Sequence, residues 1–132
     1  MIKFYDTSSL LLRADNLFED KKRFIISSIT LEELEHIKTS AHKDADIKYA
    51  ARKLINALDA HIGEYDVEIF NERMEKPLVK AGIAINNDAK ILACALNYKK
   101  KLGQPIIFIT NDICLKHLAR LLFSNVESIN ED

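Results

Sequence analysis

The sequence is poor in the residues that usually interrupt regular structure. Its 132 residues include only 3 glycines and 2 prolines, and no repeat or low-complexity tract is visible. Because glycine and proline mark turns and helix ends, their scarcity favours a helix-rich protein. No hydrophobic run approaches the ~18 residues of a membrane-spanning helix, so no membrane protein is expected. A content of 48% hydrophobic and 30% charged residues argues against a disordered chain.

Cysteine and net charge are also scarce. Cys94 and Cys114 lack the spacing of a metal site, and we interpret them as reduced core or partly buried thiols of a cytoplasmic protein. The first predicted strand begins directly after Met1, so no signal peptide is expected. The net charge of −1 gives no global nucleic-acid signature, so a polyanion would have to bind local basic clusters. The length suits one domain, over residues 1–132.

Short hydrophobic runs alternate with amphipathic segments along the chain. Thr30 and Glu33 have the spacing of a capping box, Asn87 is the predicted cap of a later helix, and 71–85 is predicted to be a loop with a short helix. The alternation predicts an α/β fold, a three-layer α/β/α sandwich around a mainly parallel sheet of four or five strands. Strands are predicted at 2–5, 24–27, 67–70, 106–109 and 126–129, and helices at 8–19, 30–38, 44–60, 88–101 and 112–122.

Polar residues follow two of the predicted strands. Asp6 comes directly after the first strand, and Thr110, Asn111 and Asp112 come after the fourth. In parallel α/β sheets, ligands bind beyond the carboxyl ends of the strands. The sequence therefore places these polar residues where such a fold has its site.

Each acidic residue of interest also has a structural interpretation. Asp88 and Asp112 can favour a helix N-terminus through the helix dipole, and Glu33 can complete the capping box. Asp6 is harder to explain in this way, because a buried carboxylate after an apolar strand needs a partner. These interpretations leave open whether the four acids converge.

Four segments in the same order as in PIN domains carry a family resemblance: FYDTSSLL, SSITLEELEHIK, NNDAKILACAL and IFITND. The resemblance covers about residues 1–125, and PIN domains are a family of metal-dependent ribonucleases. The stretch EELEHIK and the helix predicted at 44–60 resemble the PIN domains found beside PhoH-type ATPases more than the VapBC-type toxins. No GxxxxGK[ST] loop is present, so no nucleoside triphosphate site is expected.

The resemblance implies a site of four acidic residues that binds Mg²⁺ or Mn²⁺. Asp6 and Asp112 would be the main ligands, Asp88 would lie near the same ion, and Glu33 would bind a second ion or orient water. Such hard cations take oxygen ligands and can activate water for phosphodiester hydrolysis. The residues expected to hydrogen-bond around these ligands are Ser8, Thr110 and Asn111.

The implied function is a metal-dependent endoribonuclease acting on single-stranded RNA. A homodimer and an antitoxin-like or other protein partner are compatible with the resemblance, and no membrane partner is expected. Two alternatives stay open, a non-catalytic RNA-binding or scaffolding PIN module and the toxin of a toxin–antitoxin pair. A dehalogenase-type phosphatase is disfavoured because Ser8 stands where its second Asp is needed. A di-iron bundle is disfavoured because Glu33-x-x-His36 has no second copy.

Overall fold

Five short strands form one fully parallel sheet in the computed structural model, which describes residues 1–129. The strand order is β3-β2-β1-β4-β5. The strands are β1 (Ile2–Tyr5), β2 (Phe24–Ser27), β3 (Asp66–Glu68), β4 (Ile106–Ile109) and β5 (Val126–Glu127). The helices are α1 (Thr7–Leu12), α2 (Ser28–Thr39), α3 (Ala45–Ala60), the 3₁₀ helix η1 (Glu72–Glu75), α4 (Lys76–Lys80), α5 (Asn87–Leu102) and α6 (Ile113–Leu122).

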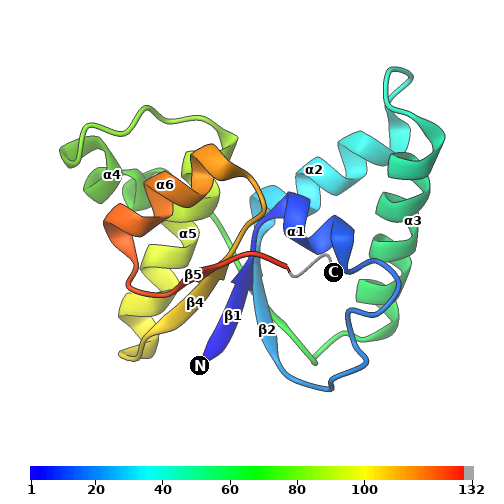
Figure 1. Ribbon diagram of the computed structural model, residues 1–132, viewed down its shortest axis with the longest axis horizontal. Helices are drawn as coiled ribbons and strands as arrows, with labels where there is room; N and C mark the ends of the chain where they lie inside the picture. Colours follow the sequence, from blue (N-terminus) through cyan, green and yellow to red (C-terminus); the bar gives the residue numbers. More distant parts are fainter. Residues whose placement is uncertain (130–132) are drawn as a thin grey trace.

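Helices cover the sheet on both faces. Figure 1 shows α4, α5 and α6 on one side, and α1, α2 and α3 on the other. Because successive side chains of a strand point to opposite faces, Phe4 enters the core beneath α5 and α6, whereas Tyr5 enters the core beneath α1 and α3. The predicted α/β architecture with a central parallel sheet is confirmed, with five strands.

The helix predicted at 8–19 is shorter than expected. Helix α1 ends at Leu12, and residues 13–20 form turns instead of a further helix. Arg13 stabilises this change of direction, because its Nε donates to Asn16 Oδ1 at 2.8 Å and its Nη2 donates to the Asn16 carbonyl at 3.2 Å. The hydrophobic residues that suggested a longer helix, such as Leu17, are still buried, but they reach the core from the turns.

Two predicted helix caps are wrong. Helix α2 is capped by Ser27, whose Oγ accepts a hydrogen bond from the Ile29 N–H at 3.0 Å, so Thr30 lies inside the helix and forms no capping box with Glu33. Helix α5 is capped by Asn86, not Asn87. In both cases the sequence offers more than one possible cap within a few residues, and the position of the preceding strand or loop decides between them.

Two strands are shorter than predicted or shifted. Strand β3 stops at Glu68 rather than at residue 70, and the Phe70 N–H instead donates to Ser28 Oγ at 2.9 Å. Strand β5 stops at Glu127. Beyond it, the Ser128 hydroxyl donates to the Thr110 carbonyl and the Ile129 N–H donates to Asn111 Oδ1. The segment 71–85 contains η1 and α4, in agreement with a loop that carries short helices.

The two cysteines have different environments. Cys94 is buried, and burial raises the pKa of its thiol to about 11, as expected for an inert core residue. Cys114 is exposed on α6, so its predicted place in or near the core is wrong. Among residues 1–129, no helix is both long and apolar enough to cross a membrane.

Candidate functional site

The site lies where the order of the sheet reverses. From β1 the chain moves outward to β2 and β3, and it then returns to the other side of β1 to form β4 and β5. Asp6 follows β1 and Asp112 follows β4, and these two strands are paired directly, with Tyr5 in register with Ile109. In open α/β sheets, ligands bind in the crevice at this reversal, beyond the carboxyl ends of the strands.

Asp6 is buried and held by several donors. Asp6 is only 3% exposed. Its Oδ1 caps α1 by accepting a hydrogen bond from the Ser9 N–H at 2.9 Å. Oδ2 accepts from Thr110 Oγ1 at 2.5 Å and from Ser8 Oγ at 3.1 Å. A carboxylate can be buried when it accepts hydrogen bonds in this way, and its position is then fixed.

Thr110 connects the two aspartates of the strand ends. Its buried hydroxyl donates to Asp6 Oδ2 and accepts a hydrogen bond from the Asp112 N–H at 3.1 Å. Asp112 in turn caps α6, because its Oδ1 accepts from the Leu115 N–H at 3.0 Å. Thr110 therefore fixes the spacing between a buried aspartate and an exposed one.

Asn111 anchors the segment that follows β5. Its Nδ2 donates to the Ile129 carbonyl at 3.2 Å, and its Oδ1 accepts from the Ile129 N–H at 2.7 Å. These two bonds hold the segment that follows β5 against the end of β4. Asn111, which was expected to form hydrogen bonds around the acids, therefore anchors this segment through its side chain.

Glu33 reaches the same edge of the sheet from α2. Its Oε1 accepts a hydrogen bond from Thr7 Oγ1 at 2.6 Å, and Thr7 Oγ1 also lies 3.0 Å from the Thr30 hydroxyl. Thr7 was not predicted as a site residue, although it follows Asp6 directly in the sequence. The signal for it is the run Asp6-Thr7-Ser8, in which a strand end is followed by a residue whose hydroxyl can face the neighbouring helix.

Asp88 approaches from the first turn of α5. It is half-buried, and Asn86 caps the helix by accepting from the Ala89 N–H at 2.9 Å, so Asp88 is not needed for that bond. Burial raises the pKa of Asp88, and the charges of Asp112, Glu33 and Asp6 raise it further, in that order. The ionised form of Asp88 is therefore repelled by the other three acids.

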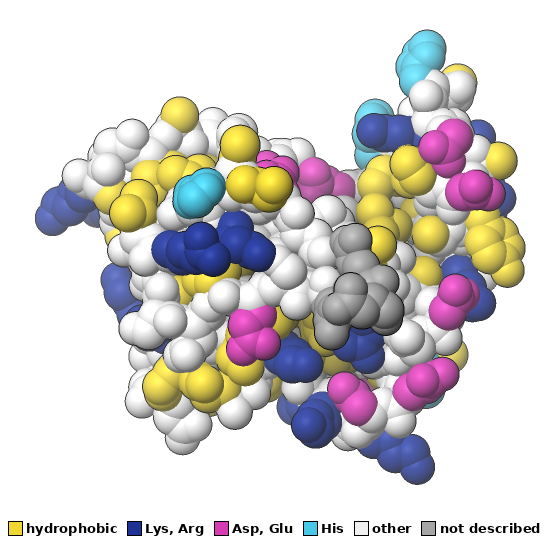
Figure 2. Space-filling model, in the orientation of Figure 1, with side chains coloured by type: hydrophobic (Ala, Val, Ile, Leu, Met, Phe, Trp, Pro, Cys, Tyr) yellow, Lys and Arg dark blue, Asp and Glu magenta, His cyan; other side chains and the backbone are white. Residues whose placement is uncertain are grey.

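The four acids share an electrostatic environment without forming a compact ligand cluster. Within residues 1–129, no three His, Cys, Asp or Glu side chains lie together as a ready metal site. The donor set nevertheless fits a hard divalent cation, because all four side chains offer carboxylate oxygens and their mutual repulsion would be relieved by positive charge. Figure 2 shows acidic side chains at the top of the molecule, between the α6 side and the α2 side.

A pocket opens beside these acids. It has a volume of about 340 Å³ and extends from Glu33 and Asn87 to His36 and Lys43, with Glu32 and Ile37 in its wall. His36 is exposed. The pocket offers room for a ligand next to the acidic edge, together with one lysine that can contact an anion.

Comparisons with known proteins agree with this geometry. The sequence profile of the PIN domain matches residues 4–130, whereas no curated protein matches the chain. A similar solved structure is that of VapBC2 from Rickettsia felis bound to a DNA fragment from their promoter. One of its chains has a TM-score of 0.59 and 19% sequence identity, with 97% of this chain and 98% of that chain covered. The profile match spans nearly the whole sequence, and the chain belongs to the PIN domain family.

Proposed function

We propose that this protein is a divalent-metal-dependent endoribonuclease that hydrolyses phosphodiester bonds of single-stranded RNA. The observation that carries the proposal is the pair of strand-end aspartates, Asp6 and Asp112, whose charges, together with that of Glu33, raise the pKa of Asp88 beyond the effect of burial. Structural carboxylates are normally paired with a cation or a donor, whereas Asp88 faces the negative charge of Asp6, Glu33 and Asp112. Membership of the PIN domain family supports a nuclease function.

Asp6 and Asp112 would be the principal metal ligands. Asp6 is fixed by Thr110 and Ser8, whereas Asp112 uses only Oδ1 to cap α6, which leaves Oδ2 for a ligand. Asp88 and Glu33 would complete the acidic set from the two helices that border it. Bound Mg²⁺ or Mn²⁺ would activate water and neutralise the charge of the phosphate.

The residues around the acids would control their geometry. Thr110 keeps Asp6 and Asp112 at a constant separation, and Thr7 directs Glu33 toward the sheet edge. Such supporting hydrogen bonds orient metal ligands, and their loss typically weakens metal binding 10–100-fold. The pocket with His36 and Lys43 would receive a nucleotide next to the scissile bond, with Lys43 facing its phosphate.

The test is cleavage of a fluorescently labelled single-stranded RNA with Mn²⁺, Mg²⁺ or EDTA. We expect cleavage with either metal and none in excess EDTA. Asp6→Asn and Asp112→Asn should each lower the rate by several orders of magnitude. Asp46→Asn, which changes an exposed aspartate in the first turn of α3, is the matched control and should leave the rate unchanged. Undiminished cleavage in EDTA would rule out the metal-dependent mechanism.

A toxin role is a second candidate, favoured by the likeness to a chain of VapBC2 over almost the full length of both chains. In that case the protein would have an antitoxin partner, and expression of the wild type alone should arrest growth while Asp6→Asn should not. An RNA-processing enzyme would cleave RNA in vitro without arresting growth. A non-catalytic RNA-binding or scaffolding module would bind the labelled RNA but leave it intact with either metal.

A further inference from the structure

A lysine occupies the middle of the central strand. Lys3 lies on β1, which is paired on both sides, and it is in register with Phe24 of β2 and Ile107 of β4. The central strands of parallel sheets are normally apolar on both faces, because helices cover both. Lys3 is only partly exposed, so its position on the sheet is unusual for a charged side chain.

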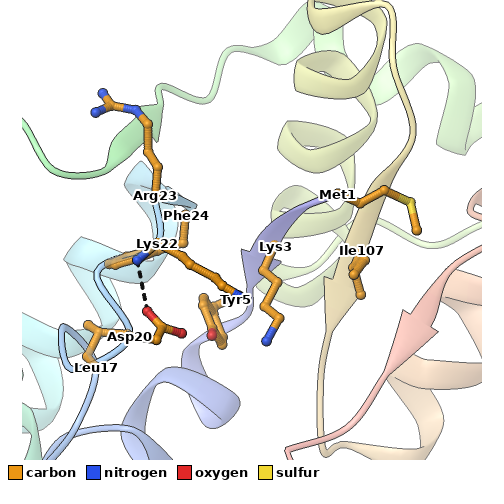
Figure 3. A pocket seen from close by; sticks show the side chains of 9 residues that line it. All are labelled: Met1, Lys3, Tyr5, Leu17, Asp20, Lys22, Arg23, Phe24 and Ile107. Carbon is orange, nitrogen blue, oxygen red and sulfur yellow. Dashed lines mark hydrogen bonds between the residues drawn. The ribbon is translucent and has the colours of Figure 1, made fainter.

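The sheet is open where Lys3 lies. Helix α1 has only six residues, and the turns at 13–20 that follow it bring Leu17 and Asp20 beside Lys3. The result is a pocket of about 240 Å³, separate from the acidic edge. Its floor includes Tyr5, Phe24 and Ile107, and Lys3 and Lys22 border it, whereas the Arg23 side chain extends away from them (Figure 3).

The three cations differ in their contacts within residues 1–129. Arg23 is engaged, because it donates to Asp66 and to the Gly63 carbonyl. By contrast, neither Lys3 nor Lys22 forms an ion pair with any carboxylate of residues 1–129. Figure 3 shows the side chain of Lys22 extending toward Tyr5, and that of Lys3 lying beside the same ring.

The acid of the pocket does not neutralise them. Asp20 Oδ1 accepts a hydrogen bond from the Lys22 backbone N–H at 3.0 Å, and Asp20 Oδ2 lies 3.9 Å from Arg13. Its charge is thus shared with Arg13, which also donates to the Tyr5 hydroxyl at 3.1 Å. The pocket keeps an excess of positive charge above an apolar floor, which strengthens its attraction for an anion.

We propose that this pocket binds a phosphate group, carried either by a free nucleotide or by an RNA strand. Lysine ammonium groups bind phosphate as point charges. The aromatic rings do not provide a stacking platform for a base, because Tyr5 is 2% and Phe24 is 3% exposed. Recognition would therefore be directed at the phosphate and not at the base, and it would be independent of sequence.

The position along β1 relates this pocket to the acidic edge. Lys3 lies on β1 and Asp6 directly follows this strand, three residues further along, which corresponds to about 10 Å at roughly 3.3 Å per residue. If the ligand is RNA, the pocket would hold a phosphate away from the scissile one, and in that form the inference rests on the proposed ribonuclease function. Phosphate binding itself does not depend on cleavage.

The experiment is calorimetric titration in EDTA, which suppresses metal-dependent cleavage. The ligands are inorganic phosphate, a nucleoside monophosphate, and a short single-stranded RNA with either a 5′-phosphate or a 5′-hydroxyl. Lys3→Gln and Lys22→Gln should each weaken binding at least about tenfold, and for RNA each should reduce the salt dependence by about one charge. Lys80→Gln, at an exposed lysine of α4, is the matched control and should have less than a twofold effect.

The arms separate the possible outcomes. Tight binding of the monophosphate identifies a nucleotide site, whereas a preference for RNA, with or without its 5′-phosphate, identifies a strand-binding site. Equal affinities for wild type and both pocket variants would refute the pocket, and so would equal weakening by Lys80→Gln. Lys22→Glu, at an exposed position, should abolish binding even if Lys3→Gln fails to fold. Asp6→Asn should keep phosphate binding, so failure of the cleavage assay and failure of this inference are distinguishable.

Discussion

Replacing Asp88 by Asn tests whether the acids at the sheet edge repel one another without metal and bind a divalent metal ion together. In EDTA the substitution removes the charge that burial and the three other acids disfavour, which should raise stability. It also removes a negative charge from the first turn of α5, which should lower stability by about 0.3–1 kcal/mol. Because Asn86 provides the cap, no capping hydrogen bond is lost. We expect Asp88→Asn to melt no lower than the wild type in EDTA.

Asp46→Asn isolates the contribution of the helix dipole. Asp46 and Asp88 are both the second residue of their helices, and both helices are capped by the side chain of the preceding residue. Asp46 is exposed and lies outside the acidic edge. With an unfolding entropy of about 0.28 kcal/mol/K for 132 residues, a loss of about 0.3–1 kcal/mol corresponds to a fall in Tm of about 1–4 °C.

Mn²⁺ should reverse the order of Asp88→Asn and wild type. At a hundredfold excess over Kd, binding stabilises the folded wild type by about 2.7 kcal/mol, or about 10 °C. If loss of Asp88 weakens binding about tenfold, the same Mn²⁺ concentration gives only about 1.4 kcal/mol, or about 5 °C. The measurement is a set of six melting curves, for wild type and the two variants with and without Mn²⁺. Equal Mn²⁺ shifts in all three proteins would remove Asp88 from the metal site.

The pH dependence provides an independent check on the same residue. The pKa of Asp88 is higher in the folded state than its ordinary value of 3.8, so folding favours the protonated form. Its stabilising contribution is thus present below the unfolded pKa and is lost as the pH rises through the folded pKa. In EDTA, the advantage of Asp88→Asn should be absent at low pH and should grow over this window. An advantage that is independent of pH would refute the electrostatic explanation.

Two further substitutions test the supporting contacts. Thr110→Val removes the hydroxyl between Asp6 and Asp112, so it should cost about 1–3 kcal/mol of stability and weaken Mn²⁺ binding about 10–100-fold. Thr39→Val, at an exposed position of α2, is its control in the same melting and titration experiments, and an equal effect would refute the role of Thr110. Glu68→Ala leaves the partners Asn97 and Lys101 unpaired at the edge of the sheet. It should lower the free energy of unfolding in urea by roughly 1–3 kcal/mol, whereas the exposed Glu72→Ala should change it little; a similar change in both would show that the Glu68 contacts contribute nothing.

The sequence contains most of the information about the strands and very little about where some helices begin and end. The run before Asp6 and the run before Thr110 are apolar and end at a polar residue, and both were predicted to the residue. The end of α1 was not, because it depends on contacts between Arg13 and Asn16 that have no periodic signature. The finer resemblance to PhoH-associated PIN domains stays a prediction, since the profile match establishes the family only.

The sequence suggested that the four acids converge only through the family resemblance. Pairing of β1 with β4 brings Asp6 and Asp112 to the same edge of the sheet, although they are far apart in the sequence. At the same place, the Ser9 hydroxyl donates to the carbonyl of Ile109, 100 positions further along the chain. Nothing in the local pattern specifies the order β3-β2-β1-β4-β5, which arises from packing of helices on both faces. The pocket at Lys3 was missed for the same reason, since one lysine in an apolar run gives no indication of what covers it.

The structural and the functional interpretations of the strand-end aspartates are compatible. Asp6 and Asp112 each use Oδ1 to cap the helix that follows, through the N–H groups of Ser9 and Leu115. Capping needs an oxygen but not a charge, and Asn caps helices about as well as Asp. A metal ligand at these positions needs the charge as well. Each aspartate can therefore start a helix and still serve a metal, and the two roles should respond differently to substitution.

Asp112→Asn and Asp112→Ala separate these roles. Asn keeps the capping oxygen, so it should change stability little in EDTA, whereas Ala should cost about 0.5–2 kcal/mol because the Leu115 N–H loses its acceptor. Both variants lose the carboxylate, and both should lose cleavage and the stabilisation by Mn²⁺. Asp44→Asn and Asp44→Ala make the matched pair at the cap of α3, where stability should follow the same pattern while activity is kept. If Asp112→Asn cleaves RNA at the wild-type rate, the charge of Asp112 is not required, and the aspartate is a helix cap alone.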